Sequence, residues 1–382
     1  MTTKSTTTEA INTSSKPERI AIAGAGLLGR LLAWQLNKAG IDVTLFEAGS
    51  FTITNPQTNR AAAFTAAGMV APLSEAVVSD AGVYRMGQFA LGHWPLWVKQ
   101  LIDAASCSPR DELFFNKGSL VVAHPQDTAE LEQFERELNF VIPECRNYKR
   151  VTQSQIHELE PDLNPHFQHG LFLEEEGHLH NRQFLHQLGE AILHSNIHLR
   201  EHSQVSVSPG KISLNGISEN FDLVIDCRGI GAKPQVKQLR GVRGETLHVQ
   251  TTEIQLQRPV RLMHPRYQLY VVPKPDNFFV IGATQIESED RSPVTLQSTL
   301  ELSSALYTLA PAFAEARIIE MDTNLRPAFM DNLPHVSLSQ GLITANGLFR
   351  HGYLLAPAVV ENILAQVLQD RLPVFSDLLN RS

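Results

Sequence analysis

The segment of this chain that most restricts its fold is residues 20–47, which read IAIAGAGLLGRLLAWQLNKAGIDVTLFE. An apolar run ends in a glycine-rich sequence, a helix-patterned segment follows, and a second apolar run ends at Glu47. In such a strand–helix–strand unit, Gly24 forms the tight turn, Gly26 lets the backbone approach a pyrophosphate, and Gly29 allows helix and strand to pack closely. The segment therefore predicts a Rossmann-like fold that binds a dinucleotide.

The same segment limits which dinucleotide is expected. Its phosphates would lie at the N-terminus of the helix, where free N–H groups and the helix dipole favour negative charge. Glu47 follows the glycines by about 20 residues, where a carboxylate accepts hydrogen bonds from ribose hydroxyls and disfavours a 2′-phosphate. We therefore expect NAD or FAD rather than NADP. A glycine-rich turn without a ligand is the alternative, although Ala33 and Gly40 also agree with the motif.

Length, charge and cysteine content narrow the class of protein. A chain of 382 residues is long enough for two domains. The net charge of −8 argues against a nucleic-acid partner, and no run of 18 apolar residues predicts a membrane span. Cys107, Cys145 and Cys227 are far apart and form no C-x-x-C pair, which fits a reducing compartment, and we expect a cytoplasmic protein. Residues 1–18 are rich in Thr and Ser and predict a disordered tail.

Two further segments favour FAD over a nicotinamide cofactor. Residues 61–72 read AAAFTAAGMVAP, and such a row of small side chains predicts that a backbone or a flat ligand passes close by. A tightly packed helix start is the alternative there. Residues 221–232 read FDLVIDCRGIGA, a buried strand ending in glycines that returns the chain to the first sheet. A two-part FAD domain requires such a return, whereas a single nicotinamide domain does not.

Hydrophobic patterning supplies the other elements. Helices are predicted at residues 83–102, 128–140, 183–194 and 297–310 and at the C-terminus, and strands at 118–123, 198–207, 211–214, 247–250, 268–273, 278–283 and 342–345. The strands at 247–250, 268–273 and 278–283 predict an antiparallel sheet inserted into the α/β domain. His178 and His180 could begin a metal site, but no Asp or Cys completes the set, so no metal is expected.

These residues resemble the D-amino-acid oxidase superfamily and, within it, glycine oxidase of the thiamine-biosynthesis type. The motifs that carry the resemblance are GAGLLG with Glu47, TAAGMVAP at 65–72, YVVP at 270–273, IGAT at 281–284, LRP at 325–327 and GLFRHGYLLAP at 347–357. The last three in this order are the most selective. The resemblance runs from about residue 20 to the last helix.

The resemblance implies an α/β fold in two parts, a discontinuous Rossmann-like FAD-binding domain and an inserted antiparallel-sheet substrate domain. The expected boundaries are 19–85, 150–236 and 322–382 for the FAD-binding domain, and 86–149 and 237–321 for the substrate domain. Some sarcosine oxidases attach FAD through a cysteine near the position of Arg326. No cysteine follows Cys227, so FAD is expected to be bound non-covalently.

The resemblance also implies which residues hold FAD. The residues expected around the dinucleotide are Gly24, Gly26, Leu27, Leu28, Gly29, Glu47 and Ala48, and those expected along the flavin are Ala62, Ala63, Ala67, Gly68 and Met69. Val205 is expected to meet the adenine through its backbone. The residues expected at the pyrimidine edge of the flavin are Leu348, Phe349, Arg350, His351, Gly352, Tyr353 and Leu354. The C-terminal helix, with Pro357 expected in its first turn, would direct its positive end at the flavin.

On the substrate side, the resemblance implies three catalytic residues. Arg326 would bind a substrate carboxylate through two parallel hydrogen bonds, Tyr270 would donate its hydroxyl to the same carboxylate, and Arg350 would shape the pocket. The implied activity is oxidative deamination of glycine, sarcosine or a small D-amino acid, with oxygen as electron acceptor and hydrogen peroxide as product. A homo-oligomer is compatible with this function.

Some positions depart from the family pattern and keep two other functions open. Arg228 stands where a small residue usually precedes the glycine, His351 replaces a small amide, and Phe329 makes the segment after LRP more apolar. These departures leave room for a flavoprotein that modifies an amine or a residue within a protein or another macromolecule. An NAD-dependent dehydrogenase is suggested only by the first strand–helix–strand unit, and the second strand return argues against it.

Overall fold

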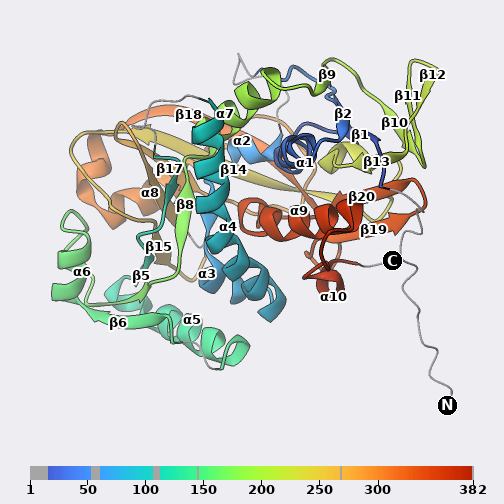
Figure 1. Cartoon of the computed structure of the whole chain (residues 1–382). Coiled ribbons are helices and arrows are strands. Elements are labelled where there is room, and N and C mark those ends of the chain that lie inside the picture. The colour runs from blue at the N-terminus through green and yellow to red at the C-terminus, as the bar shows by residue number, and fades with distance from the viewer. Residues whose placement is uncertain (1–15, 53–60, 106–111, 144–145, 267–268, 381–382) are drawn as a thin grey trace.

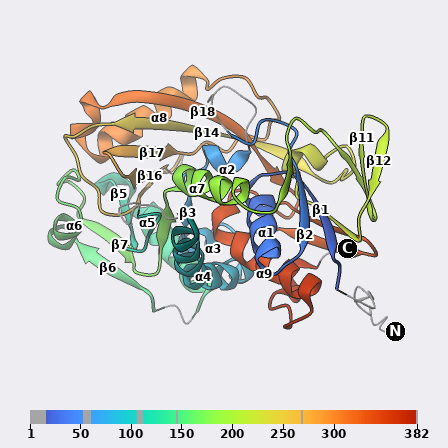
Figure 2. The ribbon, with the colours of Figure 1, turned by 45° about the horizontal axis from the view of Figure 1, so that its top comes forward.

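Two sheets with helices packed against them form the body of the protein (Figures 1 and 2). The computed structural model describes residues 16–52, 61–105, 112–143, 146–266 and 269–380. Most of the expected tail, Cys107 and Cys145 lie outside these ranges. Within the described ranges, no helix is both long enough and apolar enough to cross a bilayer.

The first sheet has six strands and contains the glycine-rich motif. In spatial order its strands are β19 (His335–Ser339), β20 (Leu342–Asn346), β13 (Leu223–Asp226), β1 (Arg19–Ala23), β2 (Asp42–Phe46) and β9 (His198–Arg200). All neighbours are parallel except β19 and β20. The parallel register of Ile20 with Leu223 confirms that the chain returns to the first sheet after the glycine-rich unit.

Four helices cover this sheet and share its core. They are α1 (Leu27–Lys38), α4 (Ala81–Ala105), α7 (Asn181–Leu193) and α9 (Gly352–Leu368). Both α1 and α4 pack against α9, and both also contact α7. Leu31, Leu32 and Leu36 lie on one side of α1 and are fully buried, as the helical spacing predicts. The C-terminal helix is therefore locked beside the glycine-rich unit, although about 300 residues separate the two in sequence.

The second sheet has eight strands and forms the other half of the body. In spatial order they are β18 (Arg317–Ala328), β14 (Arg240–Gln250), β17 (Phe278–Gly282), β16 (Leu269–Lys274), β15 (Val260–Met263), β5 (Ser119–Ala123), β7 (His169–Leu173) and β6 (Tyr148–Thr152). Only β15 and β5 pair in parallel. The helices α5 (Thr128–Val141), α6 (Gln153–Leu159) and α8 (Leu296–Leu309) flank this sheet.

Shorter elements complete the fold. They are the sheet of β10 (Ser206–Ser208), β11 (Lys211–Leu214) and β12 (Ile217–Asn220), the sheet of β3 (Met69–Val70), β8 (Gly177–Leu179) and β4 (Phe114–Phe115), the helices α2 (Ala62–Thr65), α3 (Pro72–Ala76) and α10 (Ser376–Leu379), and the 3₁₀ turns η1 (Pro125–Asp127), η2 (Gly229–Ala232) and η3 (Pro311–Glu315). The sheet of β10, β11 and β12 packs against the first sheet at β13, and its β11–β12 hairpin projects from the body (Figure 2).

The structure differs from the sequence analysis at several boundaries. The expected strand 198–207 is two strands, β9 and β10, in different sheets, because the chain leaves the first sheet at Glu201. The antiparallel sheet is larger than expected: β6 crosses residue 150 and β18 crosses residue 322, so two of the four expected domain boundaries fall inside strands of this sheet. Helix α4 packs against α9 in the first core, whereas residues from 86 were expected in the substrate domain.

Candidate active site

A cavity of about 1610 Å³ lies between the two sheets and reaches from the glycine-rich turn to the face of β16 and β18. All the candidate residues from the sequence except Gly29 line it. Ligand pockets typically measure about 300–1,000 Å³, so this cavity has room for a ligand of dinucleotide size and a small second molecule. The cavity also extends to α8, where Gln297 and Glu301 line it.

At one end of the cavity, glycines allow three backbone segments to meet. Gly24 has φ +96°, and a Cβ there would lie 2.7 Å from the carbonyl oxygen of Cys227. A Cβ on Gly29 would lie 1.8 Å from the Gly24 carbonyl oxygen, so Gly29 packs against the turn. It does not itself line the cavity. The first turn and the strand return therefore touch through backbone atoms, as a dinucleotide site requires.

Glu47 is oriented by the same turn. One carboxylate oxygen accepts a hydrogen bond from the Ala25 N–H at 2.8 Å, and the other accepts from the Gly49 N–H at 2.9 Å. The side chain is therefore fixed at the end of β2, on the cavity wall, with lone pairs still available for hydroxyl donors.

Arg228, the departure noted in the sequence, lies beside the predicted adenine position. Its guanidinium forms an ion pair with Asp226 at 2.6 Å and donates to the carbonyl oxygen of Val205 at 3.0 Å. Because its charge is compensated and its side chain lies along the wall, the bulky residue fits where the family usually has a small one.

The row of small residues passes along the middle of the cavity. Gly68 has φ +75°, and a Cβ there would lie 2.7 Å from the Leu179 carbonyl oxygen. Asn181 donates its amide to the carbonyl oxygens of Ala63 and Ala66, and the Tyr353 hydroxyl donates to Ala63 at 3.0 Å. This segment is a fixed, nearly flat wall of small side chains, and its shape fits a planar ring such as isoalloxazine.

The C-terminal helix begins at this wall. Residues 348–351 line the cavity, and α9 starts at Gly352. Pro357 lies in the second turn of α9, so the expectation of a first-turn proline is wrong. Proline has no N–H to bond to the carbonyl oxygen of Tyr353, and that oxygen instead accepts from the Trp94 indole N–H at 2.9 Å. The helix therefore continues past the proline with its N-terminus facing the cavity.

Arg326 and Tyr270 lie on the second sheet, and glycines make space for both. A Cβ on Gly244 would lie 2.4 Å from the Arg326 guanidinium carbon, and a Cβ on Gly282 would lie 2.9 Å from the Tyr270 hydroxyl oxygen. Burial lowers the pKa of Arg326 and raises that of Tyr270, but the arginine stays charged and the phenol stays protonated near neutral pH. The site thus presents a cation and a hydroxyl donor to the cavity.

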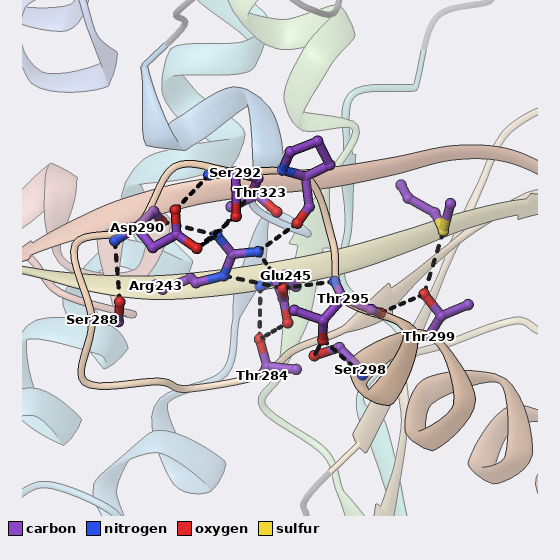
Figure 3. A network of polar contacts seen from close by, with 12 residues as sticks. Arg243, Glu245, Thr284, Ser288, Asp290, Ser292, Thr295, Ser298, Thr299 and Thr323 are labelled. Atoms are coloured by element: carbon purple, nitrogen blue, oxygen red, sulfur yellow. Dashed lines mark hydrogen bonds and ion pairs between the residues drawn. The ribbon is translucent and has the colours of Figure 1, made fainter.

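A polar network centred on the buried side chains of Arg243 and Glu245 joins β14 to the segment 284–298 (Figure 3). Arg243 pairs with Glu245 at 2.6 Å, and its guanidinium also donates to three carbonyl oxygens of residues 290–293. Glu245 in turn accepts from the Thr284 hydroxyl at 3.1 Å. The network therefore fixes Thr284 and Arg243, whose carbonyl oxygens both accept from Arg326.

Arg350 and His351 converge on Glu75, a residue that the sequence analysis did not identify. The Glu75 carboxylate lies 2.8 Å from the Arg350 Nε and 3.1 Å from the His351 Nδ1. The His351 Nε2 lies 2.9 Å from the Ser79 hydroxyl. The histidine that replaces a small amide is therefore held from both sides, and burial lowers its pKa, which favours the neutral imidazole.

Other residues of the site also escaped the sequence analysis. Gly244 stands inside β14 but before the predicted strand 247–250, and a glycine inside a strand is a sequence signal for close approach of another group. Thr284 belongs to the IGAT motif, but its contact with Glu245 depends on strand pairing and has no local signal. His178 is buried in β8 and stacks on Phe115, and among the described residues no three metal-ligand side chains converge.

Comparison with known proteins agrees with this geometry. A Rhizobium etli protein assigned to thiamine biosynthesis as the oxidoreductase ThiO is 36% identical over 353 residues, which cover 92% of this chain and 97% of that protein. Glycine oxidase of Pseudomonas aeruginosa is 25% identical, covering 94% of this chain and 96% of the relative. The crystal structure of glycine oxidase from Geobacillus kaustophilus superposes with a TM-score of 0.80 at 22% identity, over 96% of this chain and 99% of that one, which confirms the predicted fold class. The model of the family described as FAD dependent oxidoreductase (DAO) matches residues 19–366, and the chain belongs to this family.

Proposed function

We propose that this FAD-dependent oxidoreductase is an oxidase that deaminates a small amino acid, namely glycine, sarcosine or a small D-amino acid. Oxygen would be the electron acceptor. For a primary amine, the balanced reaction consumes the amino acid, oxygen and water and yields the 2-oxo acid, ammonia and hydrogen peroxide. The relatives named above as glycine oxidases support this substrate class.

One observation carries the proposal. Arg326 lines the cavity, is only partly exposed, and donates to two carbonyl oxygens, those of Arg243 and Thr284. Among the described residues, no carboxylate lies within ion-pair distance of its guanidinium. A buried cation without an anionic protein partner is costly unless a ligand supplies the charge. A substrate carboxylate is the ligand that a guanidinium binds best.

The other residues of the site would orient the substrate. The Tyr270 hydroxyl, which lines the same cavity, would donate to the carboxylate that Arg326 binds. The wall of small residues from Ala62 to Met69 and the loop 348–354 would hold FAD, and the N-terminus of α9 would stabilise negative charge on it. FAD supplies the hydride acceptor when it is bound.

No side chain is required as a general base. A substrate that binds with its amine neutral can lose the α-hydrogen as hydride, and the resulting imine is hydrolysed by water. The chain's contribution is the fixed position of the α-carbon, set by the two contacts to the carboxylate, and the exclusion of bulk water by buried walls.

Oxygen consumption tests this function directly. The purified holoprotein is assayed in an oxygen electrode with glycine, sarcosine, D-alanine and D-proline, and peroxide is measured with catalase. We expect one of these substrates to consume oxygen, with half of the oxygen returned on addition of catalase. A yellow protein that consumes no oxygen with any of them would contradict the proposal.

A further inference from the structure

The carboxylate of Glu75 lies where a substrate carboxylate could otherwise bind. Glu75 follows Pro72 in the short helix α3 and lines the cavity, yet its side chain is only 9% exposed. One oxygen lies 2.8 Å from Arg350 Nε, and the other accepts from a terminal nitrogen of Arg261 at 2.8 Å. The guanidinium of Arg350 is thus already occupied by an anion of the protein.

Glu75 is ionised in this environment. Burial alone would raise its pKa, but Arg350, His351 and Arg261 outweigh burial and hold the pKa well below its usual range. Glu75 is therefore negatively charged in the neutral pH range. Arg261 is 2% exposed and does not line the cavity, so of the two arginines that pair with Glu75 only Arg350 faces a ligand.

Arg326 and Arg350, which both line the cavity, consequently differ. Arg326 is bonded to backbone carbonyl oxygens, whereas Arg350 is bonded to a carboxylate. Both arginines and Glu75 lie close enough to influence Tyr270 electrostatically. A second substrate carboxylate at Arg350 would lie beside the Glu75 carboxylate and be repelled by it.

We propose that Glu75 is a specificity-determining residue that occupies Arg350 and restricts the site to substrates with one carboxylate, held at Arg326. Glu75 acts here through Arg350 and by its own charge, without taking part in the chemistry. The inference rests on the proposed function, because it assumes that the cavity binds amino acids at Arg326. It predicts that N-substituted glycines are accepted when the substituent is neutral and rejected when it carries a second carboxylate.

The test compares two matched ligands that contain no amine and are therefore not substrates for amine oxidation. Methylthioacetate and thiodiacetate have the shapes of sarcosine and iminodiacetate with sulfur in place of the amine, and they differ by one carboxylate. Each is titrated into the holoprotein, and Kd is read from the change in flavin absorbance. The unaltered protein should bind methylthioacetate at least tenfold more tightly than thiodiacetate. If the unaltered protein binds thiodiacetate as tightly as methylthioacetate or more tightly, that result alone overturns the proposal.

The variant Glu75→Gln keeps the shape of the side chain and removes its charge. We expect the ratio of the two Kd values to shift at least tenfold toward thiodiacetate, while the flavin spectrum shows that FAD remains bound. In the double variant Glu75→Gln with Arg350→Gln, the ratio should return toward that of the parent. The Arg350 guanidinium, which would bind the second carboxylate once Glu75 is neutral, is absent in this variant. A ratio within twofold of the parent in Glu75→Gln would overturn the proposal.

Glu176→Gln serves as the matched control. Glu176 is a buried carboxyl group in the connection between β7 and β8, bonded to Ser74 and Ser119, and it does not line the cavity. Its removal should change the ratio less than threefold. A shift as large as that of Glu75→Gln would mean that the loss of any buried carboxyl group changes the ratio, and would overturn the specific role of Glu75.

The same titrations separate failure of this inference from failure of the proposed function. If neither ligand perturbs the flavin, the cavity does not bind small carboxylates and the proposed function fails. If methylthioacetate binds and Arg326→Ala abolishes its binding, the carboxylate site stands. An unchanged ratio in Glu75→Gln would then count against Glu75 alone.

Discussion

Arg326 donates a guanidinium N–H to the carbonyl oxygen of Thr284 across 3.0 Å, and this contact directs the arginine at the cavity. The carbonyl oxygen is available because Thr284 is fixed from its other side by Glu245. The proposed anchor for a substrate carboxylate is thus positioned by strand pairing in the second sheet, while the glycine-rich turn of the cofactor site belongs to the first sheet. Function depends on how these two sheets are held together.

Replacing Arg326 by alanine tests the anchor. Loss of a two-bonded charged contact costs about 2–4 kcal/mol, so KM for the amino acid should rise by roughly 30- to 1000-fold. FAD affinity, measured by flavin fluorescence, should change little, because the contacts of Arg326 are on the second sheet. Arg317→Ala, on the exposed end of the same strand, is the control and should leave KM unchanged. Unaltered amino-acid kinetics in Arg326→Ala would rule out the anchor.

Tyr270→Phe tests the second donor to the carboxylate. Losing one hydrogen bond to a charged group costs about 1.5–3 kcal/mol. We therefore expect kcat/KM of the variant to be at least tenfold lower than that of the parent. Because burial raises the pKa of Tyr270, its phenol stays protonated through the neutral range. The variant and the parent should therefore show the same shape of kcat/KM against pH between 6 and 9. A basic limb that disappears with the hydroxyl would show that Tyr270 titrates in that range.

Gly29→Ala tests the close contact in the glycine-rich unit. The added Cβ would lie 1.8 Å from the Gly24 carbonyl oxygen, which requires the helix or the turn to move. We expect protein that is colourless or loses FAD during gel filtration. Gly92→Ala is matched to it as a helix glycine with nothing within 4 Å of the new Cβ, and it should keep its FAD. Full FAD occupancy in Gly29→Ala would contradict the geometry.

Glu176 predicts a pH dependence of stability. Burial raises the pKa of Glu176 from 4.5 to about 7 in the folded protein. The folded state therefore binds its proton more tightly than the unfolded state does, and the stability it contributes below pH 4.5 is lost as pH rises to 7. The loss is on the order of 3 kcal/mol.

Urea unfolding of the parent and of Glu176→Gln at pH 5 and pH 8 measures this effect. The free energy of unfolding of the variant, relative to that of the parent, should increase by about 2–3 kcal/mol between the two pH values. A difference that does not depend on pH would show that the carboxyl group has the same pKa in the folded and unfolded states.

How far the sequence predicts this molecule depends on how local each feature is. The glycine-rich unit and the strand return at Asp226 are local patterns, and the structure confirms their pairing. Strand β18 escaped prediction because residues 317–324 are largely exposed and their apolar side chains, Ile318, Ile319 and Met321, do not alternate with polar ones.

The candidate site shows the same division. Nearly all the candidate residues that the family motifs supply line the cavity, because each motif brings a short continuous segment to its wall. Glu75 was missed because its partners, Arg261 and Arg350, are about 190 and 280 residues away, and only the packing of α3 between the two sheets brings them together. Pro357 was placed one turn too early because the start of α9 is set by the loop before it.

The central claim is that the cavity binds a small amino acid at Arg326 with its α-carbon facing FAD. An anaerobic absorbance titration of the holoprotein with glycine, sarcosine, D-alanine and D-proline tests this claim most directly. We expect that at least one of them bleaches the flavin absorbance band and that Arg326→Ala requires a far higher concentration for the same bleaching. A flavin band that none of the four bleaches would contradict the account and favour a larger or macromolecule-bound amine.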